Sequence, residues 1–166
     1  MGSKNTVIEK EKVSYDGIFD LKELYTHLHD WLTWRKYDVA EKKYKEKVTQ
    51  GGKDIDVEWE AKRSADEYSD FVISIKANAK GINDVEVQKD ASKVKMQKGS
   101  VDFEISATLI TDKNDVWEAR PSFKFLQKFY ERYLYKNDLD RLQGELDKHG
   151  RGLLNEIKAF LNLYQF

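Results

Sequence analysis

The chain has 166 residues, with 29 Lys plus Arg against 30 Asp plus Glu, so its formal net charge is −1. This balance gives no overall attraction to nucleic acid or to an anionic membrane. The lack of cysteine excludes disulfides, thiolate zinc sites and a cysteine nucleophile. The 8 Phe, 9 Tyr and 4 Trp argue against intrinsic disorder. Since no apolar run could span a bilayer and no secretory signal is present, we expect one soluble, cytoplasmic α+β domain over residues 1–166.

The first expected elements are a strand and a helix. Residues 6–14 alternate apolar and charged side chains, which predicts a strand, and Tyr15-Asp16-Gly17 predicts a turn after it. Asp20 has the character of a helix N-cap, with Glu23 three residues on. Helical spacing then links a set of apolar residues: Leu21, Leu24, Tyr25, Leu28, Trp31 and Leu32. These signals predict a helix over residues 20–36.

Residues 37–112 show a period of two, which indicates strands. Ile55, Val57, Trp59 and Ala61 alternate with charged residues, after a hairpin turn at Gly51-Gly52. Comparable patterns predict six consecutive strands, at residues 39–48, 55–62, 71–79, 85–87, 94–96 and 101–109. Strands that follow one another at such short spacing form an antiparallel meander. We therefore expect a curved antiparallel sheet of six strands, or of seven if the N-terminal strand joins it.

The chain after Thr111 returns to helical spacing. Pro121 suits the first turn of a helix, whose apolar arc comprises Phe123, Leu126, Phe129, Tyr130, Tyr133 and Leu134. Whether the rest forms two more helices, bracketed by Gly150 and Gly152, or one long kinked helix and a terminal one is left open by the spacing. We expect the aromatic helix to cover the sheet. The expected core is Trp59, Phe71, Ile73, Ile75, Phe103, Ile105, Leu126, Tyr130, Ile157 and Phe160.

This order of elements resembles the helix-grip fold of the START/Bet v 1-like (SRPBCC) superfamily. The likeness is one of topology along nearly the whole chain, and Gln50-Gly51-Gly52-Lys53 stands where the plant members carry a glycine-rich loop. The resemblance implies a sheet packed on C-terminal helices and a cavity for a hydrophobic ligand. It implies no catalytic residue.

Catalytic and metal-binding patterns are weak. His27 and His29 are two apart on a helix and point in different directions, so they cannot share a metal ion. His149 precedes Gly150 near an expected helix end, where we expect its cationic form to stabilise the helix C-terminus through the helix dipole. No nucleophile elbow or phosphate-binding loop is present. We therefore expect no enzymatic activity, no metal and no cofactor.

A row of basic residues is the clearest charged feature of the chain. Arg120, Lys124, Lys128, Arg132 and Lys136 recur every four residues, and Glu131 is the only acid among them after residue 120. Like charges at this spacing oppose helix formation, which suits either an anionic partner or an outer helix face balanced by acids elsewhere. Four further lysines, Lys89, Lys93, Lys95 and Lys98, lie on a predicted hairpin and could extend the row into one patch.

Two functions are therefore expected. The leading one is non-enzymatic binding of a small hydrophobic molecule between the sheet and the C-terminal helices, against Trp59, Phe129, Tyr130 and Tyr133. It requires an internal cavity of roughly 300 Å3 or more. The alternative is an interaction module that binds RNA, an anionic membrane surface or an acidic protein through the basic row. If the interior is filled, the alternative becomes the better hypothesis.

Overall fold

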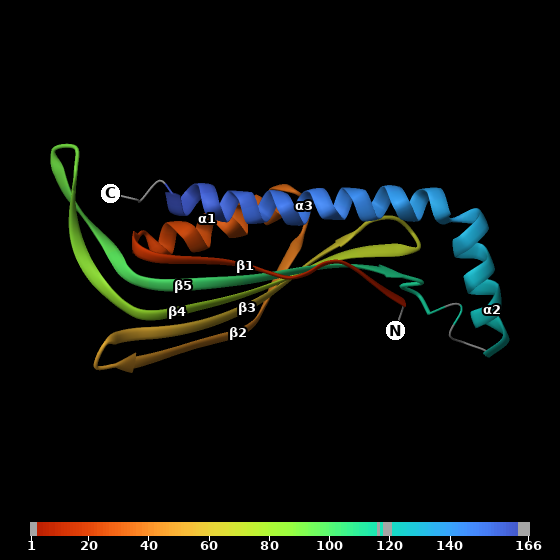
Figure 1. The fold of residues 1–166 in the computed structure, drawn as a ribbon, viewed down its shortest axis with the longest axis horizontal. Helices are drawn as coiled ribbons and strands as arrows, with labels where there is room; N and C mark the ends of the chain where they lie inside the picture. Colours follow the sequence, from red (N-terminus) through yellow and green to blue (C-terminus); the bar gives the residue numbers. More distant parts are fainter. Residues whose placement is uncertain (1–2, 116, 118–120, 163–166) are drawn as a thin grey trace.

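The computed structural model describes residues 3–115, 117 and 121–162. Five strands form one antiparallel sheet, in the order β1-β5-β4-β3-β2 (Figure 1). The strands are β1 (Ser3–Phe19), β2 (Asp38–Thr49), β3 (Gly52–Ser64), β4 (Ser69–Lys89) and β5 (Ser92–Thr111). Helices α1 (Leu21–Trp34) and α3 (Lys136–Asn162) lie side by side on one face of the sheet. Helix α2 (Pro121–Phe129) and the π-helical turn η1 (Tyr130–Leu134) lie beyond one end of it.

The α+β class, the antiparallel meander and helix α1 confirm the prediction from sequence. The side chain of Asp20 caps α1 by accepting a hydrogen bond from the backbone N–H of Glu23 at 3.0 Å. The hairpin at Gly51-Gly52 joins β2 to β3 as expected. Strands β2 to β5 follow one another across the sheet, and β1 pairs with β5 at its edge.

The expectation of six or seven strands is wrong, because two pairs of predicted strands are continuous. Residues 71–79 and 85–87 belong to β4, and residues 94–96 and 101–109 belong to β5. The sequence between them forms a bulge, with a register shift between Lys80 and Asn83. A Cβ at Gly99 would lie 2.9 Å from the Lys80 carbonyl oxygen, so glycine permits the close approach. The bulge bends the pair without ending it, and the hairpin curls upward (Figure 1).

The predicted turn at Tyr15-Asp16-Gly17 is also wrong. These residues continue β1 and pair with Val101, Ser100 and Gly99 of β5. Turn-forming composition here accompanies a strongly bent pair of strands, because glycine tolerates the bend as readily as it would the turn.

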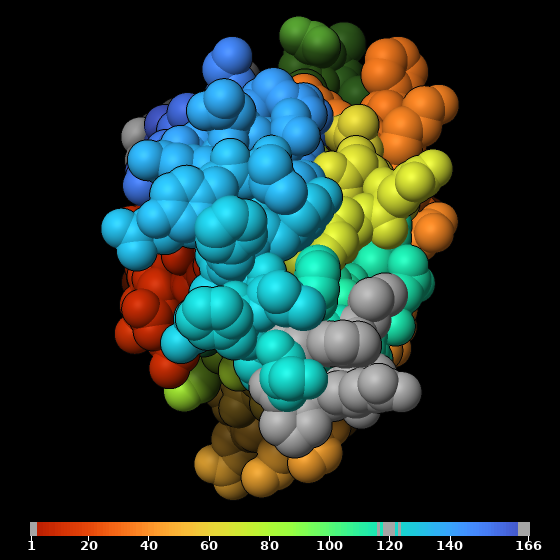
Figure 2. All heavy atoms as spheres, turned by 90° about the vertical axis from the view of Figure 1, so that its right-hand side faces the viewer, coloured from red at the N-terminus to blue at the C-terminus, as the bar shows by residue number. Residues whose placement is uncertain are grey.

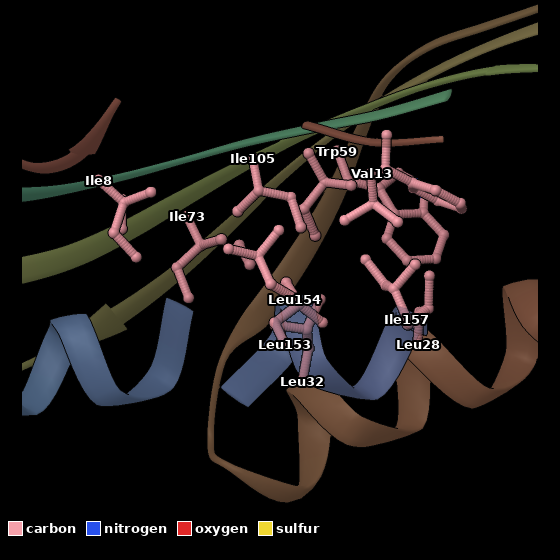
Figure 3. Close-up of a cluster of buried hydrophobic side chains, with 14 of the residues drawn as sticks. Ile8, Val13, Leu28, Leu32, Trp59, Ile73, Ile105, Leu153, Leu154 and Ile157 are labelled. Atoms are coloured by element: carbon pink, nitrogen blue, oxygen red, sulfur yellow. The ribbon is translucent and has the colours of Figure 1, made fainter. Parts of the chain in front are cut away.

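The core lies between the sheet and helices α1 and α3 (Figure 3). Eight of the ten residues expected in the core are buried, from Ile73 and Ile157 at 0% exposed to Phe160 at 6%. Tyr130 is half-buried. Leu126 is 46% exposed, so its prediction is wrong. Helix α3 supplies Leu153, Leu154 and Ile157 to this core, and the aromatic helix α2 does not cover the sheet.

Helix α3 runs without a break through Gly150 and Gly152, contrary to the expectation that they bracket a helix. A Cβ at Gly150 would collide with the side chain of Ile8 on β1, and one at Gly152 would lie 3.2 Å from the Trp31 ring. Both glycines therefore serve close packing. His149 lies in mid-helix, with its Nδ1 2.8 Å from the Tyr37 hydroxyl, so the predicted role at a helix end is wrong.

Candidate functional site

Helix α2 and the turn η1 are held to the sheet by hydrogen bonds on one side. Gln127, which is buried, donates from its amide to the Ser3 hydroxyl at 2.8 Å and to the Glu131 carboxylate at 3.1 Å. The Tyr68 hydroxyl donates to the same carboxylate at 2.7 Å. Burial, and next the Glu131 carboxylate, raise the pKa of Tyr68, which keeps this donor protonated. One side of the segment is thereby fixed against the fold.

The π-helical turn directs a second tyrosine inward. The backbone N–H of Tyr135 bonds to the Tyr130 carbonyl oxygen five residues back, at 2.9 Å. Both rings consequently face the body of the protein and stack with centroids 5.8 Å apart. The Tyr135 hydroxyl donates to the Asp66 carboxylate at 2.7 Å and lies 2.7 Å from the Ser69 hydroxyl. Such π-turns occur often at functional sites, and this one sets the orientation of α2.

The opposite side of the segment exposes apolar side chains. Within ten residues lie five of the nine exposed large hydrophobic side chains found in the described chain. They are Phe125 (76% exposed), Leu126 (46%), Phe129 (54%), Tyr133 (64%) and Leu134 (70%). Figure 2 views this end of the molecule, where the cyan atoms of α2 and η1 stand at the surface. We call Phe125, Phe129 and Tyr133, spaced four apart, the apolar row. An apolar cluster of this kind on a protein surface marks an interaction site.

A row of cations runs beside the apolar row. Lys124, Lys128, Arg132 and Lys136 are all exposed, and none of the four pairs with an acid among the described residues. We call these four the basic row. Arg120, predicted as its first member, lies outside the described residues. The alternative explanation was that acids from neighbouring segments balance the row. In the part of the chain that is described, no ion pair joins the basic row to an acid.

The two rows are adjacent in space. Successive residues of a helix lie about 100° apart around its axis, and each of the first three cations directly precedes a member of the apolar row. The Arg132 guanidinium lies 5.7 Å from the centroid of the Tyr133 ring, and the Phe129 and Tyr133 rings are 4.9 Å apart. Glu131 faces inward and is engaged by Tyr68 and Gln127. The outer face of α2 and η1 is therefore apolar along one stripe and cationic along the next.

The residues predicted to line one ligand cavity lie in two places. Trp59 is buried beneath α1, where its Nε1 donates to the Glu41 carboxylate at 3.2 Å and its ring meets that of Tyr25. Phe129, Tyr130 and Tyr133 belong to α2 and η1, beyond the other end of the sheet (Figure 1). The structure does not bring Trp59 together with these three.

A small apolar cavity lies between α1 and the sheet. It holds about 60 Å3 and is lined by aliphatic and aromatic side chains, among them Leu21, Leu28, Trp59, Ala77 and Phe103. That volume is well below the roughly 300 Å3 of a typical ligand site. The cavity adjoins an open groove of about 950 Å3, because Leu21, Tyr25 and Ile55 line both.

The lysines of the β4–β5 hairpin do not extend the basic row. This hairpin curls at the end of the sheet opposite α2 (Figure 1). Lys95 pairs with Asp84 at 3.2 Å, whereas Lys89, Lys93 and Lys98 are exposed. The two cationic regions are therefore separate surfaces.

Neither a metal site nor a membrane-spanning helix is found among the described residues. Among the described residues, no group of three or more His, Asp or Glu side chains is arranged to hold a metal ion. His27 bonds to Glu156 at 2.7 Å, across the contact between α1 and α3. No helix in the described ranges is both long and apolar enough to cross a bilayer.

Comparison with known proteins found no matching family model, no matching curated protein and no matching solved structure. The resemblance to the START/Bet v 1-like superfamily thus stays a prediction from the order of elements.

Sequence reasoning found the basic row but missed the exposure of its neighbours. Leu126 and Leu134 were assigned to a buried arc because helical spacing shows which residues share a face and not what covers that face. The sequence signal that indicates this exposure is the spread of aromatic residues, which occupy more of the helix circumference than one packed face needs.

Proposed function

We propose that the protein is an interaction module that binds an anionic partner through the basic row. The observation that carries this proposal is that Lys124, Lys128, Arg132 and Lys136 are all exposed along α2, η1 and the start of α3, with no acid paired to them in the described chain. Like charges four apart destabilise a helix by about 0.2–0.5 kcal/mol per pair. An anionic partner removes that repulsion.

The fold supports this role by presenting the row rigidly. Hydrogen bonds from Tyr68 and Gln127 hold the carboxylate of Glu131, the one acid of residues 121–136, on the inner side. The four cations consequently face solvent as a group. Each Lys or Arg near an anionic surface contributes about 1 kcal/mol to binding, so the row provides an appreciable affinity at low salt.

The experiment measures binding to three polyanions at low and high salt: poly(U) RNA, polyglutamate and phosphatidylserine-containing vesicles. The wild type is expected to bind at least one of them, and the binding should weaken as salt rises. The variant Lys124→Glu/Lys128→Glu/Arg132→Glu should lose it. All three side chains are exposed, so folding should be retained.

The matched control reverses the same number of charges at the opposite end of the molecule. Lys89→Glu/Lys93→Glu/Lys98→Glu changes three exposed lysines of the β4–β5 hairpin. It should bind nearly as well as the wild type. The proposal fails if the wild type ignores all three polyanions at low salt, or if both triple variants lose binding equally.

A second candidate function is suggested by the groove next to α1. Three of the four exposed large hydrophobic residues outside α2 and η1, namely Tyr25, Tyr44 and Val48, line it. Four of its six charged side chains form ion pairs, Lys53 with Glu46 at 2.9 Å and Lys95 with Asp84 at 3.2 Å. This favours an uncharged apolar ligand seated in the open groove, since the enclosed cavity holds only about 60 Å3.

Glycerol monodecanoate is a suitable probe for this second candidate, used below its micelle concentration in calorimetry. Tyr44→Ser/Val48→Ser removes two apolar side chains that line the groove and should weaken binding, whereas Trp34→Ser, at an exposed residue outside the groove, should not. No heat of binding to the wild type would eliminate the candidate.

A further inference from the structure

The apolar row identifies which anionic partner the basic row fits. A partner that offers only negative charge would leave the apolar row in water, yet here each of Lys124, Lys128 and Arg132 is followed by an exposed ring of the apolar row. Leaving Phe125 76% exposed is unfavourable in water. The partner must therefore supply negative charge and an apolar phase side by side.

A lipid surface has this pair of properties. An interfacial helix places Phe, Trp or Leu in the boundary between headgroups and acyl chains, with Lys and Arg beside them at the headgroups. We infer, on the basis of the proposed anion binding, that α2 and η1 dock on an anionic phospholipid bilayer, with the apolar row inserted and the basic row at the phosphates.

The aliphatic members of the surface favour lipid over RNA. Single-stranded nucleic acid is bound by aromatic rings on which bases stack, inside a cationic groove. Here Leu126 and Leu134 are exposed beside the rings, and neither can stack on a base. Moreover, the Phe129 and Tyr133 rings lie 4.9 Å apart and tilted by 44°, which leaves no room for a base between them. The surface suits acyl chains.

The position of the segment also suits a flat partner. Helix α2 turns away from the axis of α3 beyond the end of the sheet (Figure 1), and the view onto this end places α2 and η1 on its outer surface (Figure 2). A bilayer can consequently meet both rows without colliding with the sheet. The inner contacts to Ser3, Tyr68 and Asp66 keep the docked segment attached to the fold.

The first measurement is flotation with phosphatidylcholine vesicles, with and without phosphatidylserine. The wild type should float only with the anionic vesicles. Phe125→Ser/Phe129→Ser/Tyr133→Ser should lower the partition coefficient at least about tenfold while leaving the cations in place. The control, Trp34→Ser, removes the most exposed large apolar side chain outside α2 and η1 in the described chain, at 84% exposed, and should bind as the wild type does.

The second measurement is insertion depth. Because the chain has no cysteine, a spin label can be placed at Phe129→Cys alone, or at Asn155→Cys on the exposed side of α3 as a control. With anionic vesicles, the label at 129 should become accessible to oxygen dissolved in the acyl chains and protected from a water-soluble relaxation agent. The label at 155 should stay accessible to the latter.

The outcomes separate this inference from the proposed function. If the wild type binds poly(U) or polyglutamate but not vesicles, or binds vesicles with the label at 129 still in water, the lipid inference is overturned and anion binding stands. If the apolar variant floats as well as the wild type, insertion is likewise excluded. Binding to none of these partners overturns both proposals.

Discussion

Helix α3 and the segment formed by α2 and η1 are neighbours in the chain, and both repeat apolar residues at helical spacing. In α3 the apolar residues are enclosed: Leu142, Leu146, Leu153 and Ile157 are at most 2% exposed. In α2 and η1 the corresponding side chains, Phe125, Phe129 and Tyr133, face solvent. The same periodicity thus serves the core in one helix and the surface in the other.

The difference lies in what each helix meets. Helix α3 lies along the sheet and beside α1, and Gly150 lets it approach Ile8 on β1 closely. The segment before it extends past the end of the sheet and is held on its inner side by the packed rings of Tyr130 and Tyr135 and by hydrogen bonds to Gln127 and Glu131. Apolar spacing therefore predicts an amphipathic helix. The position of the helix in the fold decides whether its apolar face is covered by the protein itself or left exposed to a partner molecule.

The largest expected effect follows from emptying the α3 face. Leu146→Ala removes a side chain that is 0% exposed, and we expect it to lower the free energy of unfolding by about 2–5 kcal/mol. Urea denaturation followed by circular dichroism measures this. A change below about 0.5 kcal/mol would show that α3 is not packed on the sheet.

Adding a methyl group where α3 contacts β1 should lower the free energy of unfolding somewhat less. In Gly150→Ala the new methyl meets the Ile8 side chain, and we expect a loss of about 1–3 kcal/mol. Gly144→Ala, in the same helix with nothing within 4 Å of the added Cβ, should instead stabilise the protein by about 0.5–1 kcal/mol. Equal signs for the two variants in thermal unfolding would contradict the close approach of α3 to β1.

The attachment of η1 depends on one buried hydroxyl. Tyr135→Phe leaves the Asp66 carboxylate and the Ser69 hydroxyl without this partner, and we expect a loss of about 1–2 kcal/mol. Tyr133→Phe, which alters a hydroxyl on an exposed ring, should leave stability unchanged. Unfolding curves of the two variants that coincide would refute the anchoring role of Tyr135.

A smaller effect concerns pH. Burial lowers the pKa of His149 below its ordinary 6.5, with Arg63 and Arg35 acting in the same direction and Glu145 against it. The unfolded chain therefore takes up the proton more readily than the folded one, and stability falls as the pH drops below about 6.5. His149→Gln should flatten this part of the profile of melting temperature against pH. An unchanged slope would mean that other groups cause it.

The smallest expected effect completes the comparison between the two helices. Phe129→Ser changes a residue that is 54% exposed, and we expect a change in stability within about 0.5 kcal/mol. Together with a loss of more than 2 kcal/mol for Leu146→Ala, as expected above, this would establish by denaturation that one helix face is covered and the other is not. A large loss for Phe129→Ser would place this ring in the core.

Much of the fold could be predicted from local patterns. The alternation from Ile55 to Ala61 and the capping pair Asp20 and Glu23 gave β3 and α1 correctly, because each signal and its structure involve the same few residues. Strand number was overestimated since glycine permits both a turn and a bulge. Whether Gly99 ends a strand or bends it depends on Lys80 in the neighbouring strand, which no local window contains.

The candidate site could be predicted only in part, for the same reason. The charges of Lys124, Lys128 and Arg132 can be read directly from the sequence, since exposure is the usual state of such side chains. The exposure of Phe129 and Leu134 could not, because it results from the end of the sheet lying short of η1. No local sequence pattern connected Trp59 with Tyr130, and the structure does not place the two residues in one cavity.

The pairing of β1 with β5 has a consequence for how the chain assembles. Ser3 lies opposite Thr111, so the first strand of this sheet has its partner at the far end of the sheet sequence. Each of strands β2 to β5 pairs with its neighbour in the chain, whereas the pairing of β1 with β5 closes a long loop that contains the other three strands, which favours late pairing of β1. Since Ile8 of β1 packs against α3 at Gly150, we expect the strand β1 and the helix α3 to complete the fold together.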